Sequence, residues 1–512
     1  MSGNLQKEFG DYQTPLDFAL LVCNYIKECL EINPSVIVEP TCGVGNFVNA
    51  SLNTFSSIKK VYGIDINEEY TVICKENNKN DDRVEIIHDN FFTFDTKKLA
   101  KGTEDILVIG NPPWAMNSDL NFNLPNKINF KNLSGMDAIT GGSNFDICEY
   151  MILKLIEEFN NTNTAITMLC KTSVARNVLL ELNRNDRHVE YVKMLKFNAT
   201  KIFNIGASAC LLVIKLSKTD KNYEQCEVMD IENPKKIVDI IKVKGGTLSS
   251  AVAEVEDFEG ECEFVWRQGV KHDCASVMEL TKNEEGIYLN KKKEKLDIED
   301  ILVYPLIKSS LFKQPIIKDK FKKFVLVTQK KARQETGYIE TLAPKTWKYL
   351  NDNKVAFDKR KSSIYNGAPN FSMFGVGDYS YAKYKVGVSG FYKKALFCMV
   401  YNEEEVERPV MGDDTSYFLA FDNKDIAYTC MLLLNSKKVQ DFLFSISFQD
   451  AKRPYTKKVL QRISLKKASD VVSLQELVET EDNLKLEHVV TDEMYHLLKK
   501  ELVEYQLTFT MK

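Results

Sequence analysis

The chain has 512 residues, with 68 Lys and Arg against 72 Asp and Glu, a net charge of −4, and hydrophobic and charged contents of 44% and 27%. These ordinary values and this length predict a globular protein with two cores. Twelve cysteines without Cys-x-x-Cys pairs and five isolated histidines argue against a metal site or a disulfide framework. No apolar run is long enough for a signal region or a membrane span, so we expect no membrane association.

The first predicted strand begins at Val36 and leads through a glycine loop into a helix. The stretch reads Val36-Ile-Val-Glu39-Pro-Thr-Cys-Gly43-Val-Gly45-Asn46-Phe47. Glycines at 43 and 45 let the backbone approach a ligand closely at the carboxyl edge of a sheet. A lone Gly-x-Gly is weak evidence, because many such loops are structural.

Two further predicted strands end in acidic residues. Strand 60–65 ends at Asp65, about twenty positions beyond the glycine loop, which is the spacing that suits a carboxylate on a ribose diol. Strand 84–88 is followed by Asp89, Asn90 and two phenylalanines. Asp89 could accept a hydrogen bond from an adenine amino group, and a phenylalanine could cover the adenine face.

The fourth predicted strand, 105–110, is followed by Asn111-Pro112-Pro113-Trp114. This tetrad suits the activation of a planar, conjugated NH2 group. The Asn oxygen and the first proline carbonyl can accept its two hydrogens and stabilise the developing positive charge. The prolines fix φ and the aromatic ring can stack on the ring that carries the amine. A plain proline-rich turn is the alternative for the tetrad taken alone.

The alternation of strands and helices continues to residue 217. An Asn- and Gly-rich loop at 115–144 is expected to be functional, and a helix at 146–159 follows it. Strand 164–170, which ends before Lys171, and strand 209–215 complete the pattern. The sequence therefore predicts an α/β fold with a doubly wound, Rossmann-like sheet.

The second half of the chain carries a local excess of positive charge. Residues 301–361 hold 15 Lys and Arg against five Asp and Glu, with interleaved aromatics, and 449–458 form a second basic-aromatic loop. This pattern indicates a polyanion partner, although any single lysine here could be an ordinary solvated residue. The candidate DNA contacts are Lys322, Lys323, Lys330, Lys331, Arg333, Lys452, Arg453, Tyr455 and Lys457.

Over roughly residues 8–217 the chain resembles the S-adenosylmethionine-dependent DNA methyltransferases that modify the N6 amino group of adenine. Residues 39–47 resemble the first cofactor motif, 111–114 the catalytic motif, and 11–15 the motif that holds the methionine end of the cofactor. The last of these comes first in the chain, which is the order of the gamma group. The resemblance also implies that an aromatic of the turn at 196–207 sandwiches a flipped base. Phe203 is the first choice and Phe197 the second, although either could be a core residue.

This resemblance implies a set of site residues, with S-adenosyl-L-methionine as cofactor. The cofactor contacts are Tyr12, Thr14, Pro15, Glu39, Thr41, Gly43, Gly45, Asp65, Ile66, Asp89, Asn90, Phe91 and Asn111. The catalytic residues are Asn111, Pro112, Pro113, Trp114 and Phe203, and no metal is expected.

The expected domains are a catalytic methyltransferase domain at 1–220, a bridging segment at 221–265, a mixed α/β target-recognition domain at 266–470 and a helical element at 471–512. Expected partners are double-stranded DNA and a separate cognate restriction endonuclease. We expect a monomer in the cytoplasm of a bacterium or archaeon, associated with the nucleoid.

Three classes of function fit these motifs. The first is sequence-specific adenine-N6 methylation of DNA with base flipping. The second is methylation of another conjugated amine: an RNA amino group, cytosine N4 or a protein glutamine. The third is a non-catalytic nucleic-acid binder, which the intact Glu39, Gly43, Asp65, Asp89 and Asn111 disfavour. The roughly 290 residues after the catalytic domain favour DNA, because a duplex reader needs its own module.

Overall fold

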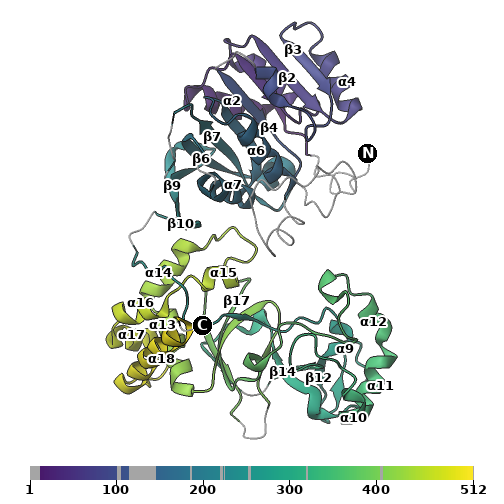
Figure 1. Ribbon diagram of the computed structural model, residues 1–512, viewed down its shortest axis with the longest axis vertical. Helices are drawn as coiled ribbons and strands as arrows, with labels where there is room; N and C mark the ends of the chain where they lie inside the picture. The colour runs from purple at the N-terminus through teal and green to yellow at the C-terminus, as the bar shows by residue number, and fades with distance from the viewer. Residues whose placement is uncertain are drawn as a thin grey trace. The chain divides into compact units, whose positions relative to one another are not determined.

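The computed structural model describes residues 12–100, 105–114, 146–184, 187–219, 223, 225–251, 255–318, 321–403 and 408–510. The chain divides into two compact units, Met1–Glu254 and Val255–Lys512 (Figure 1). Among the described residues, no helix is both long enough and apolar enough to cross a membrane.

Within its described part, the first unit is built on one mixed sheet with the strand order β10-β9-β8-β6-β7-β5-β4-β1-β2-β3. The strands are β1 Val36–Glu39, β2 Lys60–Asp65, β3 Val84–His88, β4 Ile106–Gly110, β5 Ala165–Lys171, β6 Val189–Asn198, β7 Ser208–Leu216, β8 Gln225–Asp230, β9 Asn233–Lys244 and β10 Thr247–Ser250. Strands β3, β2, β1, β4 and β5 run parallel, and β7 is antiparallel to both β5 and β6.

The helices of this unit alternate with its strands. They are α2 Leu16–Glu28, α3 Asn46–Thr54, α4 Glu68–Asn77, α6 Ile147–Glu158, α7 Thr172–Arg184 and the short α8 Ala199–Phe203, with a 3-10 turn η1 at Thr96–Ala100. Helix α2 packs on α3, and α6 packs on α7. The predicted Rossmann-like α/β fold is therefore confirmed as a large mixed sheet with alternating helices.

Burial along the strands follows their place in the sheet. Every residue of β1 and β4, which are adjacent strands, is buried. Continuous apolar runs such as Ile106-Leu-Val-Ile-Gly110 are typical of parallel strands covered on both faces. Strand β3 lies at the sheet edge and is only partly buried.

The segment 221–265, which we expected to bridge two domains, differs from that expectation. Strands β8, β9 and β10 extend the first sheet beyond β6, with β8 parallel to β6 and β9 antiparallel to β8. The lysine-rich β9 is mostly exposed, so its sequence lacks the regular alternation that predicts a half-buried strand.

The second unit contains two five-stranded sheets within its described residues, ordered β11-β20-β17-β18-β15 and β13-β12-β16-β14-β19. The strands are β11 Arg267–Gln268, β12 Glu279–Lys282, β13 Tyr288–Leu289, β14 Val303–Ile307, β15 Ile316–Lys318, β16 Lys323–Leu326, β17 Tyr384–Ser389, β18 Cys398–Tyr401, β19 Met411–Gly412 and β20 Ser416–Phe421.

Helices cover these sheets in two groups, one formed by α9–α12 and one by α13–α18 (Figure 1). They are α9 Ala275–Met278, α10 Ile339–Leu342, α11 Pro344–Asp352, α12 Lys354–Asp358, α13 Lys424–Asn435, α14 Lys437–Ile446, α15 Lys457–Leu460, α16 Leu465–Val471, α17 Leu474–Leu484 and α18 Asp492–Thr510, with 3-10 turns η3 Asp300–Leu302, η4 Ser309–Leu311, η5 Ser363–Tyr365 and η6 Asp378–Tyr381.

The C-terminal helices belong to the core of the second unit. Leu477 of α17 and Leu498 of α18 are fully buried in the same cluster as Trp266 and Leu419. Helix α13 packs on α17, α18 and β17. The helical element that we expected at 471–512 is thus an integral part of this unit and stabilises it through apolar burial.

Candidate active site

The carboxyl ends of β1, β2, β3 and β4 are joined by hydrogen bonds into one continuous edge. The Gly43 N–H donates to Asp65 Oδ2 at 2.8 Å, and the Asp89 N–H donates to the Asp65 carbonyl at 3.1 Å. On the other side, the Thr41 hydroxyl donates to the Asn111 carbonyl at 3.4 Å. The structure therefore brings together the strand ends that the sequence predicted as a row.

The loop between β1 and α3 requires glycine at both predicted positions. Gly43 has φ +51° and Gly45 has φ +90°, in the left-handed region. A Cβ atom on Gly43 would lie 2.4 Å from Oε1 of Gln13, and one on Gly45 would lie 2.4 Å from Sγ of Cys74. The loop is thus packed from both sides and presents backbone N–H groups close to the sheet edge.

Glu39, at the end of β1, is 3% exposed. Its Oε2 accepts a hydrogen bond from the Val48 N–H at 3.0 Å, so it anchors the first turn of α3. Burial raises the pKa of Glu39 well above its usual range, and the nearby Cys74 adds to this, while the Val48 hydrogen bond opposes it. Glu39 therefore fixes the start of α3, the helix that directly follows the glycine loop.

The segment Tyr12–Pro15 connects the glycine loop to the Asn-Pro-Pro-Trp tetrad. The Gln13 Oε1 accepts from the Val44 N–H at 3.2 Å, and the carbonyl of the buried Thr14 accepts from the Asn46 side chain at 2.7 Å. Pro15 is the N-cap residue of α2. The sequence did not assign Gln13 to the site. Its position inside the predicted motif was the only available signal.

Asn111 has a fixed side-chain orientation. Its Nδ2 donates to the Tyr12 carbonyl at 2.8 Å. Its Oδ1 is shielded from solvent and has no hydrogen-bond partner among the described residues. A buried, unsatisfied acceptor is costly and uncommon in a folded protein. The Oδ1 atom of Asn111, in the residue before Pro112, is therefore available to accept a hydrogen bond from a ligand.

Trp114 is held in an aromatic cluster. Its Nε1–H donates to the Leu169 carbonyl at 3.3 Å, and its ring centroid lies 5.6 Å from that of Phe203 and 6.5 Å from that of Tyr12. Phe203 is partly exposed, whereas Phe197 and Trp114 are 9% and 7% exposed. Of the two candidate aromatics of the turn, Phe203 is the one that contacts Trp114 and remains accessible.

A charged pair between Lys171 and Asp146 supports the tetrad. The ammonium of Lys171, at the end of β5, donates to the Trp114 carbonyl at 3.1 Å and to Asp146 Oδ2 at 2.8 Å. Asp146 Oδ1 accepts from the Cys148 N–H and caps α6. Burial raises the pKa of Asp146, and the hydrogen bond from Lys171 lowers it. The pair thus joins both flanks of the expected loop at 115–144, which lies outside the described residues.

Ile66 and Phe91, the apolar residues predicted to contact the cofactor at the ends of β2 and β3, differ in their exposure to solvent. The Ile66 side chain is 48% exposed, and the Asn90 Oδ1 accepts from the Phe92 N–H at 2.9 Å. Phe91 is only 5% exposed, with the Lys154 ammonium 4.6 Å from its ring centre. Phe91 turns into the core, so our expectation that it covers a ligand does not fit, and Ile66 supplies the accessible apolar surface.

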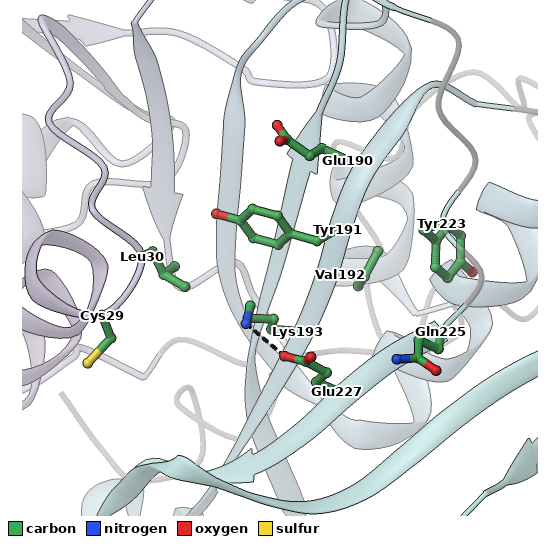
Figure 2. Close-up of a pocket in the computed structure, with 9 residues that line it drawn as sticks. All are labelled: Cys29, Leu30, Glu190, Tyr191, Val192, Lys193, Tyr223, Gln225 and Glu227. Atoms are coloured by element: carbon green, nitrogen blue, oxygen red, sulfur yellow. Dashed lines mark hydrogen bonds and ion pairs between the residues drawn. The ribbon is translucent and has the colours of Figure 1, made fainter.

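A separate pocket of about 390 Å³ lies at the other end of the strands, where β6 and β8 begin (Figure 2). Cys29 and Leu30, just beyond α2, line one side, and a Lys193–Glu227 ion pair at 2.7 Å lies in its wall (Figure 2). Because β7 is antiparallel to both β5 and β6, β6 runs in the same direction as β5, and the pocket at its start lies at the amino edge of the sheet. None of the predicted site residues lines it.

The predicted DNA contacts of the region 301–361 fall into two groups. Lys322 and Lys323 lie at the start of β16, whereas Lys330, Lys331 and Arg333 form the turn beyond its end. All five are exposed, and none forms an ion pair with another described residue. Other lysines of the region are paired, as in the contacts Lys308–Glu279 and Lys345–Asp297. Internal ion pairs therefore neutralise part of the local charge excess.

In the loop 449–458, Lys452 and Lys457 are exposed. Tyr455 is 3% exposed, and its hydroxyl donates to the Lys393 carbonyl at 2.6 Å. Our expectation that Tyr455 contacts DNA is therefore corrected, because the ring is buried beneath the loop. The Arg453 guanidinium lies 4.6 Å from the centre of the Phe391 ring.

Among the described residues, no group of three or more His, Cys, Asp and Glu side chains is arranged to hold a metal ion. The described polar groups of the edge include carboxylates, amides, the Thr41 hydroxyl and backbone N–H groups. This donor set suits an organic ligand with hydroxyl and amino groups.

No family model matches the chain. The chain is 39% identical to the type II methyltransferase M.NspV of Nostoc sp. over 485 residues. This alignment covers 92% of this chain and 100% of that protein. Over 114 residues it is 29% identical to the type II methyltransferase M.CvrRI of Paramecium bursaria Chlorella virus XZ-6E, which covers 22% of this chain and 27% of that one.

Solved structures give weaker matches. The methyltransferase subunit of a type I restriction-modification system from Streptococcus thermophilus has a TM-score of 0.32 at 12% identity, over 48% of this chain and 52% of that one. The ATP-dependent type ISP restriction-modification enzyme LlaBIII, bound to DNA, has a TM-score of 0.41 at 10% identity, over 80% of this chain and 33% of that one. Both TM-scores are below 0.5, so family membership rests on the sequence relative.

Proposed function

The chain belongs to the type II methyltransferases, and from this premise we propose that it methylates the N6 amino group of adenine at a specific sequence in double-stranded DNA. Family membership confirms the predicted class of enzyme, with S-adenosyl-L-methionine as its cofactor. The observation that carries the finer proposal is the buried Oδ1 of Asn111, which has no partner among the described residues.

The tetrad supports an aromatic amine as the methyl acceptor. The hydrogen bond from Nδ2 to the Tyr12 carbonyl prevents the Asn111 amide from turning over, so Oδ1 remains the acceptor. One amine hydrogen is accepted by this oxygen and the other by the Pro112 carbonyl. Both acceptors stabilise the positive charge that develops on the nitrogen as its lone pair leaves conjugation. The proton leaves to water after the transfer.

The residues of the sheet edge fit the bound cofactor, which supplies a methyl group already activated on a sulfonium. Each Asp65 oxygen accepts a backbone N–H, one from Gly43 and one from Asn67, which fixes the carboxylate at the end of β2, where it can accept a ribose hydroxyl. Asp89 can accept from the adenine amino group, and Ile66 can cover the adenine face. The segment Tyr12–Pro15 and the glycine loop would hold the methionine end.

Capture of the target base requires that it leave the duplex, at a cost of a few kcal/mol. Trp114 and Phe203 supply the aromatic surfaces on which a flipped base would stack. Trp114 is covered by Phe203 and Tyr12, so entry of the base displaces an edge contact between rings rather than solvent alone. Alignment of the amine with the methyl donor supplies much of the rate.

The second unit is proposed to recognise the DNA target, with its exposed lysines on phosphates. The enzyme is proposed to act as a monomer on one strand at a time, and a separate restriction endonuclease of the same sequence specificity is the proposed partner in the cell.

The test is methyl transfer from labelled S-adenosyl-L-methionine to duplex DNA, RNA and protein in parallel, followed by hydrolysis of the labelled product to single nucleosides or amino acids. The proposal expects label in DNA alone, as N6-methyldeoxyadenosine. Label in N4-methyldeoxycytidine, in RNA or in glutamine would refute it in favour of that acceptor.

A further inference from the structure

One edge of the β11-β20-β17-β18-β15 sheet collects loops from distant parts of the chain. Strands β17 and β20 pair so that Ser389 lies opposite Ser416, which places the loop after β17 beside the loop before β20. The Gly390 N–H donates to the Thr415 carbonyl at 3.0 Å, and the Gly269 N–H, just after β11, donates to the Ser416 carbonyl at 3.1 Å. We call residues 267–269, 390–394, 413–415 and 449–457 the reading edge.

The loop 449–457 is fastened to the others by side chains from both sides. The Lys393 ammonium donates to the Ala451 carbonyl at 2.7 Å, and the buried Tyr455 hydroxyl donates back to the Lys393 carbonyl at 2.6 Å. Arg453 Nη1 donates to the Asp414 carbonyl at 3.5 Å. These contacts hold the loop against 390–394 and 413–415, so its side chains are presented from a supported backbone (the β17 and α15 region of Figure 1).

Two arginines of the reading edge are braced by aromatic rings. The Arg453 guanidinium lies 4.6 Å from the Phe391 ring centre, and that of Arg267 lies 4.5 Å from the Tyr379 ring centre. Neither forms an ion pair with a carboxylate among the described residues. A guanidinium held on a ring loses less conformational freedom when it binds, and its planar fork keeps its donors for a bidentate partner.

The exposed Gln268 lies next to Arg267 in sequence and shares an acceptor with Arg453. Its Nε2 donates to the Asp414 carbonyl at 2.6 Å, the same oxygen that Arg453 reaches. The braced guanidinium of Arg453 and the amide of Gln268 are therefore presented side by side, whereas Arg267, the neighbour of Gln268 in β11, lies on the opposite face of the strand. Arg453 differs from the exposed Lys452 and Lys457, which have flexible stems and no cation–π contact with a ring among the described residues.

We propose that the reading edge reads bases in the major groove of the DNA target, and that Arg453 selects a guanine of the recognition sequence. Gln268 contacts a neighbouring base edge, and Lys452 and Lys457 contact phosphates. A bidentate contact from arginine to O6 and N7 of guanine is the commonest specific contact in DNA recognition. Phosphate contacts from lysine position the protein without sequence information. This inference rests on the proposed action on DNA.

The test is selection of bound duplexes from a random library by the full-length protein, followed by sequencing, for the wild type and for Arg453→Lys. The substitution keeps the charge and removes the fork. We expect the wild type to select a defined sequence that contains guanine, and Arg453→Lys to lose the preference for guanine at one position by about tenfold or more. Its salt dependence of binding should be unchanged, because the number of phosphate charges neutralised is the same.

Two matched variants separate reading from charge and from folding. Phe391→Leu removes the brace but not the arginine, and should weaken the preference at the same guanine. Lys452→Gln should weaken binding to all sequences equally and lower the salt slope by about one unit. Arg453→Gln gives a second measurement at the same residue, and thermal melting shows that each variant is folded.

An unchanged selected sequence in Arg453→Lys, in Phe391→Leu or in Arg453→Gln would overturn the inference, and so would a wild-type sequence without guanine or the absence of any selected sequence. Failure of the proposed function has a different signature. A wild type that selects a defined duplex but yields no N6-methyldeoxyadenosine would refute adenine methylation and leave the reading edge standing.

Discussion

Replacement of Asn111 by alanine removes the two hydrogen-bonding groups on which the proposed chemistry depends. The lost Oδ1 is the buried acceptor without a partner, and the lost Nδ2 is the donor to the Tyr12 carbonyl at 2.8 Å. The two losses act on different quantities. The acceptor acts on the transition state for methyl transfer, whereas the donor contributes to the free energy of unfolding.

The magnitudes follow from this separation. Removal of one preorganised group that stabilises transition-state charge costs about 2.7–4 kcal/mol, or roughly a hundredfold to a thousandfold in rate. Loss of the hydrogen bond to Tyr12 costs about 0.5–1.5 kcal/mol of stability. We therefore expect Asn111→Ala to be folded, to bind cofactor and DNA with nearly wild-type affinity, and to transfer methyl groups at least a hundredfold more slowly.

Single-turnover methyl transfer with enzyme in excess over a duplex measures the chemical step directly. Asn351→Ala is a matched control, because it also removes an asparagine donor to a backbone carbonyl, at 2.9 Å, but on α11 of the second unit. The control should retain the wild-type rate. A rate for Asn111→Ala within about threefold of the wild type would refute the role of Oδ1 as the amine acceptor.

Further predictions concern the cofactor, the supporting ion pair and a buried lysine. Asp65→Ala should weaken cofactor binding by about 1.5–3 kcal/mol, since it removes a charge-assisted hydrogen bond, and unaltered affinity by calorimetry would contradict the ribose contact. In Lys171→Met the Trp114 carbonyl loses its hydrogen-bond donor, so the rate of methyl transfer and the fluorescence of a 2-aminopurine at the target position should both fall. Lys171→Arg should restore part of both. Equal defects in the two variants would argue for a merely structural role. Burial lowers the pKa of Lys385 to about 7. The pKa of the same lysine in the unfolded chain is 10.5, so between about pH 7 and 10.5 the unfolded state binds more protons than the folded state. Lys385 therefore makes the free energy of unfolding rise with pH over this range, by at most about 1.4 kcal/mol per pH unit. In urea unfolding, the free energy of unfolding of Lys385→Met should lack this rise with pH. Parallel pH profiles for the wild type and Lys385→Met would show that Lys385 is not neutral in the folded protein.

The strands that carry the candidate site could be predicted closely from the sequence. The expected strands 60–65 and 84–88 have these same bounds in the structure, 105–110 differs by one residue, and the expected strand that begins at Val36 ends at Glu39. The reason is physical: β1 and β4 are fully buried and largely apolar, as parallel strands covered on both faces are, and they end at Glu39 and Gly110.

Contacts between distant segments could not be predicted in the same way. The orientation of the Asn111 amide depends on the Tyr12 carbonyl, 99 positions away, and the support of Trp114 depends on Lys171. Local sequence patterns cannot predict hydrogen bonds between residues so far apart in the chain. The burial of Tyr455 and Phe91 has the same origin, since an aromatic beside charged residues reads as a surface contact until its packing is known.

The exposed strand β9 shows a different limit. Its residues Ile237 and Val238 are exposed, so the apolar side chains do not mark one buried face. Pairing with β8 and β10 through the backbone, rather than burial of one face, makes this segment a strand.

The central claim is that this chain methylates adenine N6 at one DNA sequence through Asn111. The most direct measurement is modification-sensitive sequencing of genomic DNA from a host that lacks other DNA methylation and expresses either the wild type or Asn111→Ala. The account predicts N6-methyladenine at every copy of one sequence with the wild type, and none with the variant. N4-methylcytosine, no modification with the wild type, or equal modification by both proteins would contradict it.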